Sequence, residues 1–256
     1  MLIKHLSKSQ IFLYTECSLK YKFQYADELP KPFKASALAF GIAVHAALEW
    51  LHKEKLKGEE VSYERLVKIF EADWYSQKVD TDLRFKNGDT WETLKLKGKE
   101  LLSLYFNDPI KKVAAAEYAF EVPLVNPRTK EKLDVPLNGI IDVIEDGDII
   151  GEFKTSARSM DAVSIKNNLQ LTAYAYAYQV LFNKEVQGLK IINFVKNKTV
   201  KKETLKTTRG ADDFERLFYL ARMVLKGIRS NLFYPRFNFM CADCEYVPQC
   251  RAWQGH

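Results

Sequence analysis

The segment from residue 138 to residue 155, NGIIDVIEDGDIIGEFKT, places charged side chains inside two strongly apolar runs. The runs flank the turn signal EDGD, which predicts a β-hairpin between them. Asp142, Glu152 and Lys154 would therefore lie on strands whose other side chains suit a protein core. A buried charge is costly unless it is paired or binds a metal. The hairpin thus predicts a site that compensates these charges.

The length of the turn decides whether the two carboxylates meet. Side chains alternate between the faces of a strand, so Glu152 and Lys154 share one face. With a two-residue loop, the numbers of cross-strand partners sum to an odd value, and Asp142 would lie on the opposite face from Glu152. A three-residue loop or a single bulge brings the two onto one face. We therefore predict an odd-length turn or a bulge around Asp146 and Gly147.

Two neighbouring carboxylates repel each other unless a cation lies between them. Hard divalent ions such as Mg²⁺ and Mn²⁺ prefer oxygen ligands of this kind. A lysine beside them stabilises an anion or assists a bound water. The alternative interpretation is a solvated hairpin with charges placed by chance. Five apolar neighbours count against it: Ile140, Ile141, Ile149, Ile150 and Phe153.

Length and composition favour a folded globular chain. With 256 residues, of which 47% are apolar, the chain can bury a substantial core without disulfides. No apolar run approaches the roughly 18 residues of a membrane span, and the first 16 residues lack the hydrophobic stretch and cleavage site of a signal peptide. We therefore expect a cytoplasmic protein without a membrane partner. A net charge of +6 suits a polyanionic partner.

The four cysteines indicate a metal site. Three form a Cys-x2-Cys-x5-Cys cluster near the end of the chain, and Cys17 is the only other cysteine. Proteins in reducing compartments rarely keep disulfides, so clustered thiols point to metal. Four thiolates suit Zn²⁺ or an iron–sulfur cluster, and spacing does not separate the two. With Cys17 as the fourth ligand, the site would be a structural clasp between the two ends of the chain.

Hydrophobic periodicity predicts the order of the elements. A serine cap and a helix are expected over 7–14, a second helix over 38–57, and two more within 61–106, the later one capped by Thr90. Strand character begins at 117–122, breaks at Pro123 and at 126–127, and resumes at 132–137 before the hairpin. Further strands are expected at 190–195 and 199–206, and an amphipathic helix from Asp212 through Ile228. We interpret 51–115 as a helical insertion that covers a substrate groove.

Three segments admit two interpretations each. Residues 169–182 alternate Ala and Tyr like a strand, but their length and composition favour a helix, with Gln170 and Tyr174 on one face. That helix face either takes part in the function or packs as a stripe against the protein core. His45 is either an ordinary helix residue or a ligand, and the small residues before it permit close approach to another element. The lysines at 196, 198, 201, 202 and 206 either bind phosphates or protect an exposed edge strand.

The order of these features resembles the iron–sulfur branch of the PD-(D/E)XK nuclease superfamily. That branch includes the nuclease domains of the RecBCD and AddAB recombination enzymes and the CRISPR-associated adaptation nucleases. Its pattern is an early cysteine, a Gly-x-x-x-His helix, Asp on one strand, Glu-x-Lys on the next, a Gln-x-x-x-Tyr helix and three late cysteines. The matching residues are Cys17, Gly41, His45, Asp142, Glu152, Lys154, Gln170, Tyr174, Cys241, Cys244 and Cys250. The chain departs from the pattern at Ser18, where proline is usual, and at Ile141.

The resemblance implies an α/β (α+β) fold of the restriction-endonuclease type. Such a fold has a central mixed sheet flanked by helices, here as one domain over 1–256 that includes the helical insertion and a terminal clasp formed by 231–256 with Cys17. The implied ligands of Mg²⁺ or Mn²⁺ are His45, Asp142, Glu152 and the backbone carbonyl of Phe153. Lys154 would activate water, Gln170 and Tyr174 would contact DNA, and the four cysteines would hold a 4Fe–4S cluster, with Zn²⁺ as the less favoured occupant.

Two functions of different classes follow. The first is a metal-dependent deoxyribonuclease that acts on single strands or DNA ends, with a helicase, recombination or CRISPR adaptation partner. The second is a nucleic-acid-binding or complex-docking iron–sulfur module with little or no cleavage. The set of Asp142, Glu152 and Lys154 favours the first. A ferredoxin-like electron carrier fits poorly, because one cysteine lies far from the others. A glycine-rich phosphate loop is absent from the sequence, which argues against an ATP-driven motor.

Overall fold

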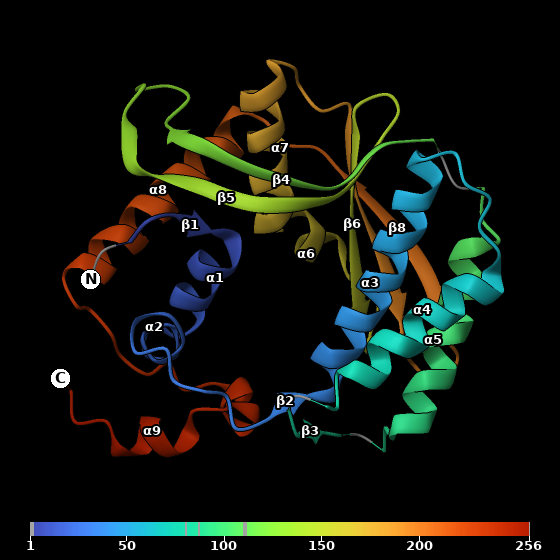
Figure 1. Ribbon diagram of the computed structural model, residues 1–256. Coiled ribbons are helices and arrows are strands. Elements are labelled where there is room, and N and C mark those ends of the chain that lie inside the picture. The colour runs from blue at the N-terminus through green and yellow to red at the C-terminus, as the bar shows by residue number, and fades with distance from the viewer. Residues whose placement is uncertain (1–2, 80, 87, 110–111, 256) are drawn as a thin grey trace.

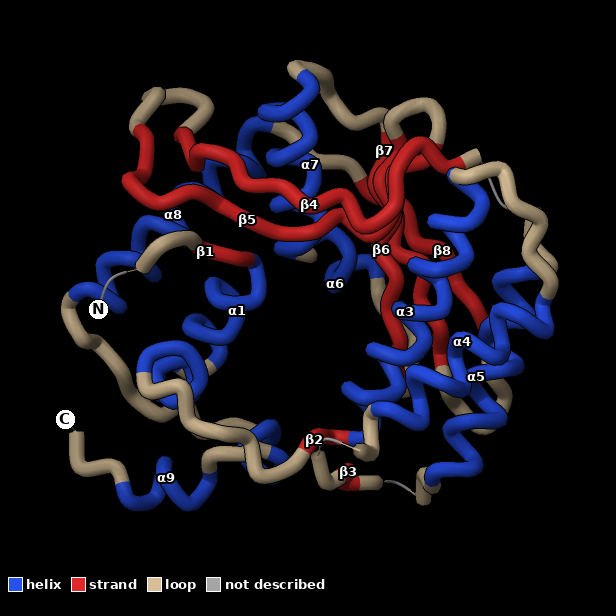
Figure 2. Tube along the Cα trace, in the orientation of Figure 1, coloured by secondary structure: helices blue, strands red, loops and turns tan. Residues whose placement is uncertain are grey.

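The chain folds around one mixed sheet with helices on both faces (Figure 1). The computed structural model describes residues 3–79, 81–86, 88–109 and 112–255. The main sheet has the order β1-β5-β6-β7-β8, and β4 also pairs with β5 (Figure 2). The expected mixed sheet flanked by helices is therefore confirmed. The strands are β1 Leu6–Ser7, β2 Lys34–Ala35, β3 Leu83–Arg84, β4 Val113–Val125, β5 Lys132–Glu145, β6 Ile149–Ser156, β7 Gly188–Val195 and β8 Lys201–Thr207.

Two groups of helices bury the two faces of this sheet. One core packs Ile150, Leu189 and Ile191 against α1, α7 and α8. The other packs Phe153 and Phe194 against α3, α4 and α5. The helices are α1 Lys8–Glu16, α2 Ser18–Tyr21, the π-helix η1 Lys22–Ala26, α3 Ser36–Leu56, α4 Tyr63–Ser76, α5 Trp91–Phe106, α6 Ala162–Lys166, α7 Leu169–Phe182, α8 Ala211–Arg229, the 3₁₀ helix η2 Phe239–Asp243 and α9 Val247–Ala252. Among the described residues, no helix is both long and apolar enough to span a bilayer.

The turn between β5 and β6 has the predicted odd length. Glu145 pairs with Ile149 and Val143 with Gly151, so residues 146–148 form a three-residue loop. Gly147 and Asp148 adopt left-handed backbone conformations with φ of 81° and 58°, which glycine and aspartate tolerate best. If the register continues by one residue pair beyond Val143 and Gly151, Asp142 lies opposite Glu152. The turn therefore brings both carboxylates to one face, as predicted.

The predicted break at Pro123 is wrong. Strand β4 runs through Pro123 to Val125, and Pro123 lies opposite Pro136 of β5. Within the described part of the chain β4 pairs only with β5, so it is an edge strand. A proline that lacks its N–H is tolerated at such an edge. The second predicted break is correct, because residues 126–131 form the turn between the two strands.

Local capping explains where several helices begin. Ser7 and Gln10 form a reciprocal capping box at the start of α1, and Thr90 caps α5 as predicted. Asn168 caps α7, so the Ala/Tyr segment is a helix, as its length and composition indicated. The range 51–115 holds the end of α3, then α4, β3 and α5, and its apolar stripes pack on α3.

The lysine-rich strand β8 forms the other edge of the main sheet. Lys196, just before it, forms an ion pair with Asp89, and Lys202 pairs with Asp108. These lysines therefore meet acidic side chains of the protein itself. The arrangement favours the protected edge over a phosphate-binding strand.

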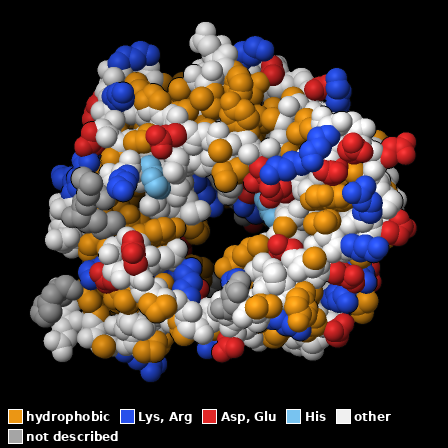
Figure 3. All heavy atoms as spheres, in the orientation of Figure 1, with side chains coloured by type: hydrophobic (Ala, Val, Ile, Leu, Met, Phe, Trp, Pro, Cys, Tyr) orange, Lys and Arg blue, Asp and Glu red, His pale blue; other side chains and the backbone are white. Residues whose placement is uncertain are grey.

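A central opening separates the N-terminal helices from α3. In the space-filling view it lies between α1 and α2 on one side and α3 on the other, with acidic and basic side chains gathered above it (Figure 3). The sheet bounds it from above, and β2, β3 and the C-terminal segment bound it from below (Figure 1). We refer to this space as the central opening.

Candidate active site

Strands β5 and β6 carry the charged residues of the hairpin to the end of the sheet beside α3 and α7. Asp142 is 6% exposed and Glu152 is 1% exposed, so both carboxylates are buried. The Lys154 ammonium forms an ion pair with Glu152. The backbone N–H of Phe153 donates a hydrogen bond of 2.8 Å to Asp142 Oδ2. The structure thus gathers the buried carboxylates Asp142 and Glu152 with the half-buried Lys154 in one cluster.

Helix α3 brings His45 to the same cluster. A Cβ atom on Gly41 would lie 3.0 Å from Thr155 Oγ1, which shows how closely the helix approaches β6. The small residues around Gly41 therefore do what the sequence suggested. His45 Nε2 lies 3.1 Å from Asp142 Oδ2 and 3.2 Å from the backbone carbonyl oxygen of Phe153. One imidazole nitrogen, one carboxylate oxygen and one carbonyl oxygen converge.

The donor atoms fit a divalent cation. Nitrogen and oxygen donors converge here, and Glu152 adds a second carboxylate. Glu152 Oε2 is buried and has no hydrogen-bond partner among the described residues. An orphaned carboxylate oxygen in a buried site is costly unless a cation or donor compensates it. The residues present therefore suit Mg²⁺ or Mn²⁺, with the imidazole favouring Mn²⁺.

The pKa values of the cluster show that it holds excess negative charge. Burial and the charge of Asp142 raise the pKa of Glu152 to about 7. Burial disfavours the His45 imidazolium, but the hydrogen bond and charge of Asp142, with the charge of Glu152, outweigh it and raise the pKa of His45 to about 9. Burial opposes ionisation of Asp142 as well, yet the bonds from His45 and Phe153 hold its pKa below the usual value. A cation bound here would displace these protons.

Helix α7 connects to the cluster through a chain of hydrogen bonds. The Lys154 ammonium donates to Gln170 Oε1 at 3.0 Å, and Gln170 Nε2 donates to the Tyr174 hydroxyl at 2.6 Å. The Tyr174 hydroxyl donates to Asp142 Oδ1 at 3.2 Å. Gln170 and Tyr174 therefore share one face of α7, and that face supports the site. Tyr174 is 3% exposed, so it orients Asp142 from inside the core.

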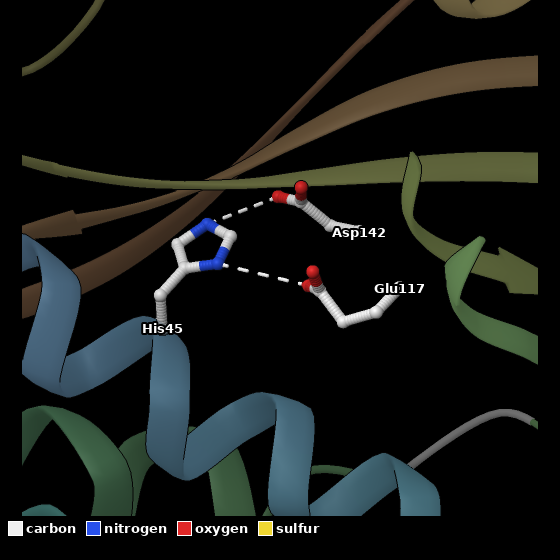
Figure 4. A group of neighbouring side chains, drawn as sticks. All are labelled: His45, Glu117 and Asp142. Carbon is white, nitrogen blue, oxygen red and sulfur yellow. Dashed lines mark ion pairs between the residues drawn. The ribbon is translucent and has the colours of Figure 1, made fainter. Parts of the chain in front are cut away.

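Glu117 of β4 also reaches the site, and the sequence did not single it out. Its Oε1 lies 4.0 Å from His45 Nδ1 (Figure 4). His45, Glu117 and Asp142 are, within the described ranges, the one trio of His, Cys, Asp or Glu whose ligand atoms all lie within 4.8 Å. Glu117 has a left-handed φ of 49° in the middle of a strand, the kind of strain that collects at functional sites. Burial, with the charges of Asp142 and Glu49, raises the pKa of Glu117 to about 7.

The four cysteines meet in one pocket at the opposite end of the opening. Cys17 lies between α1 and α2, Cys241 and Cys244 lie in and after η2, and Cys250 lies in α9. All four are free thiols and line a pocket of about 370 Å³. Burial raises the pKa of Cys244 and of Cys250. The structure thus brings the early cysteine to the late three.

Hydrogen bonds fasten the same two segments together. The Ser18 hydroxyl accepts a bond of 2.9 Å from the backbone N–H of Tyr234 and donates one of 3.2 Å to its carbonyl oxygen. The Tyr14 hydroxyl donates to the Leu232 carbonyl oxygen at 2.6 Å. Lys20 forms an ion pair of 2.6 Å with Glu245. Ser18, where the family usually has proline, therefore makes two bonds that proline cannot make.

Comparisons with known proteins agree with this arrangement. The sequence profile of the PD-(D/E)XK nuclease superfamily matches residues 5–251. The chain therefore belongs to the PD-(D/E)XK nuclease superfamily, and its mixed sheet is the restriction-endonuclease-like core of that class. A search of curated proteins finds no match.

Two solved structures match the chain, one of them with a similar fold. A protein from Eubacterium rectale named "putative exonuclease" has a TM-score of 0.62 and 12% sequence identity, over 99% of this chain and 89% of that one. This likeness supports the fold. A second protein, SSO0001, is 15% identical over 91% of this chain and 94% of its own, with a TM-score of 0.37 that is too low to indicate a shared fold.

The metal-free protein is expected to lose stability as the pH rises from about 5 to about 9. Glu117 and Glu152 bind protons up to about pH 7 in the folded state, and His45 up to about pH 9. The unfolded chain releases these protons at lower pH, so folding takes up protons in this range, and raising the pH disfavours the folded state. The melting temperature in EDTA should therefore fall from pH 5.5 to pH 9, and Mn²⁺ should reverse the fall. A constant or rising melting temperature in EDTA would contradict the assignment.

Proposed function

We propose that this nuclease-family protein is a Mg²⁺- or Mn²⁺-dependent deoxyribonuclease that hydrolyses phosphodiester bonds at single strands or DNA ends. The observation that carries the proposal is the convergence of His45 Nε2, Asp142 Oδ2 and the Phe153 carbonyl oxygen within 3.1 and 3.2 Å. Glu152, with its orphaned oxygen, and Lys154 lie beside these atoms. A positive net charge suits a nucleic-acid substrate.

Each residue has a distinct role in this proposal. His45, Asp142, Glu152 and the Phe153 carbonyl would hold the ion, and a bound ion supplies Lewis acidity and lowers the pKa of water. Lys154 directs its ammonium at the phosphate, where it donates hydrogen bonds to a non-bridging oxygen and stabilises the developing charge. Gln170 fixes that ammonium from α7, and Tyr174 fixes Asp142. Glu117 adds a further carboxylate on the β4 side.

We also propose a structural 4Fe–4S cluster on Cys17, Cys241, Cys244 and Cys250. The four thiols line one pocket, which supports a shared metal site. Four thiolates suit either Zn²⁺ or an iron–sulfur cluster. The resemblance to the iron–sulfur branch of the family supports iron over zinc.

The same proposal covers the domain organisation. Residues 1–256 would form one nuclease domain, 51–115 a helical insertion that walls the substrate groove, and 231–256 with Cys17 the cluster region. Residues 1–2, 80, 87, 110–111 and 256 of these ranges lie outside the described residues. A cytoplasmic location and a helicase, recombination or CRISPR adaptation partner complete the proposal.

Digestion of labelled DNA tests this function. The purified protein should shorten linear single strands in Mn²⁺, should leave them intact in EDTA, and should degrade closed circular single strands far more slowly if it works from ends. The competing function is an iron–sulfur module that binds DNA without cutting it. Tight binding with no Mn²⁺-dependent cleavage of any of these substrates would favour that module and overturn the nuclease.

A further inference from the structure

Helix α1, which borders the central opening, carries a lysine and an exposed aromatic ring on one side (Figure 1). Lys8 is the first residue of α1, and Phe12 follows one turn later on the same side of the helix. The Lys8 Nζ atom lies 5.1 Å from the centre of the Phe12 ring. Phe12 is 46% exposed, which is high for a large aromatic side chain. Figure 1 shows α1 bordering the opening on the side away from α3.

The start of α1 is anchored to the strand that carries Asp142. Strand β1 pairs in parallel with β5, with Ser7 beside Asn138. The capping box between Ser7 and Gln10 then fixes the direction in which α1 leaves the sheet. Lys8 is therefore held at a set position relative to β5 and its neighbour β6.

The charges of the candidate active site act on the Lys8 ammonium. Among the described residues it forms no ion pair within 4.0 Å. Burial lowers the pKa of Lys8, the charge of Lys154 lowers it further, and Glu152 raises it. Like charges repel, and an anionic phosphate bound between the two ammonium groups would relieve that repulsion.

Helix α3, on the other side of the opening, exposes apolar side chains on the face that carries His45. Leu38 and Ile42 of α3 are 50% and 39% exposed. They lie on the same side of α3 as His45, because 38, 42 and 45 follow helical spacing. A duplex buries the faces of its bases by stacking, whereas a single strand leaves them free to contact apolar and aromatic side chains.

We propose that Lys8 and Phe12 form a second wall of the substrate site, in which Lys8 binds a backbone phosphate and Phe12 stacks on the base of an adjacent nucleotide. This inference deepens the proposed function by naming the single strand as the form of DNA that enters the site. Cations with exposed aromatic rings bind single strands by this combination of phosphate contact and base stacking. Lys8 and Phe12 only bind the substrate, whereas Lys154 and the carboxylates act at the reacting atoms.

The chain offers a matched control for this pair. Tyr219 and Arg222 of α8 form a similar pair outside the proposed groove, with the Arg222 guanidinium carbon 4.8 Å from the ring centre and Tyr219 37% exposed. The variants Lys8→Met and Phe12→Ala are therefore compared with Arg222→Met and Tyr219→Ala. The probe is a fluorescein-labelled oligothymidylate, used in EDTA so that it is not cut, alongside the same strand with abasic sites.

Each variant has its own expected signature. Lys8→Met should reduce the slope of log affinity against log salt by roughly 0.7, the value for one phosphate contact on a single strand. Phe12→Ala should weaken binding of oligothymidylate roughly tenfold and leave binding of the abasic strand unchanged. Lys8→Arg should restore the salt slope. In Mn²⁺, both variants should raise KM for single strands with little change in kcat, and the α8 variants should match the wild type.

The outcomes separate this inference from the proposed function. If the wild type cleaves DNA and both α1 variants bind single strands as tightly as the wild type, the second wall is refuted and the proposed nuclease function is unaffected. The expected binding changes without any Mn²⁺-dependent cleavage would support the second wall and overturn the nuclease. Equal loss of affinity for the abasic strand in Phe12→Ala would overturn the stacking contact. A wild-type protein that binds no single strand would overturn both.

Discussion

Replacing Asp142 with asparagine is expected to lower the rate of DNA cleavage at least about 10³-fold while the protein stays folded. Asp142 contacts His45, Tyr174 and the backbone N–H of Phe153, so its carboxylate is the centre of the cluster. The asparagine side-chain oxygen can still accept the bond from Phe153, which preserves the strand. The charge that holds a cation is lost. Single-turnover cleavage in Mn²⁺ measures the effect, and circular dichroism checks the fold.

Two further variants sharpen this test. Lys154→Met should reduce the cleavage rate roughly 10²- to 10³-fold, with Mn²⁺ binding retained, because it removes the donor to the phosphate. Asp134→Asn is the matched control, since it removes an exposed carboxylate from the same strand β5. It should cleave like the wild type. Full activity of the purified Asp142→Asn or Lys154→Met protein would refute the assignment of the site.

The second large effect is expected at the cysteine pocket. Cys241→Ala should abolish the cluster and destabilise the protein by about 5 kcal/mol, the chain-entropy value for so long a cross-linked loop. For a chain of this size such a loss lowers the melting temperature by roughly 10 to 20 °C. Anaerobic purification, visible spectroscopy with iron, sulfide and zinc assays, and thermal melting measure these changes.

A variant in the same 3₁₀ helix provides the control. Asp243→Asn removes the ion pair with Lys86 and leaves every thiol in place. It should retain the colour of the wild type and nearly its melting temperature, because an exposed ion pair contributes little. Unchanged colour, iron content and melting temperature in Cys241→Ala would rule out the proposed cluster. Stoichiometric zinc without iron would replace it with a zinc site.

Sequence reasoning located the hairpin because its signals are local. Charges inside β-branched runs, together with the alternation of side chains, required an odd-length turn, and Gly147 supplied the backbone freedom for it. The helix over Leu169–Phe182 also followed from local composition and length. The late cysteines and the Glu-x-Lys pattern led to the family resemblance, which predicted the arrangement of the remaining elements. The observed mixed sheet agrees with the restriction-endonuclease-like fold that this resemblance implies.

The features that the sequence did not reveal depend on pairing between distant segments. Glu117 reaches His45 only because of the register between β4 and β5, which no local signal fixes. The position of Lys8 beside strand β5 depends on the two-residue strand β1, and so short a strand has no periodicity that predicts it. The predicted break at Pro123 is wrong because a strand tolerates proline at the edge of a sheet, and the sequence alone does not show that β4 lies there.

The cysteine pocket has a consequence for how the protein is made. Cys17 leaves the ribosome well before Cys241, Cys244 and Cys250, because a long stretch of chain separates them. Helices α1 and α2 must therefore wait for the late cysteines to be made before their partners arrive. Insertion of the proposed cofactor would follow synthesis of all four cysteines, so chains truncated before Cys241 would lack this cross-link and become substrates for proteolysis.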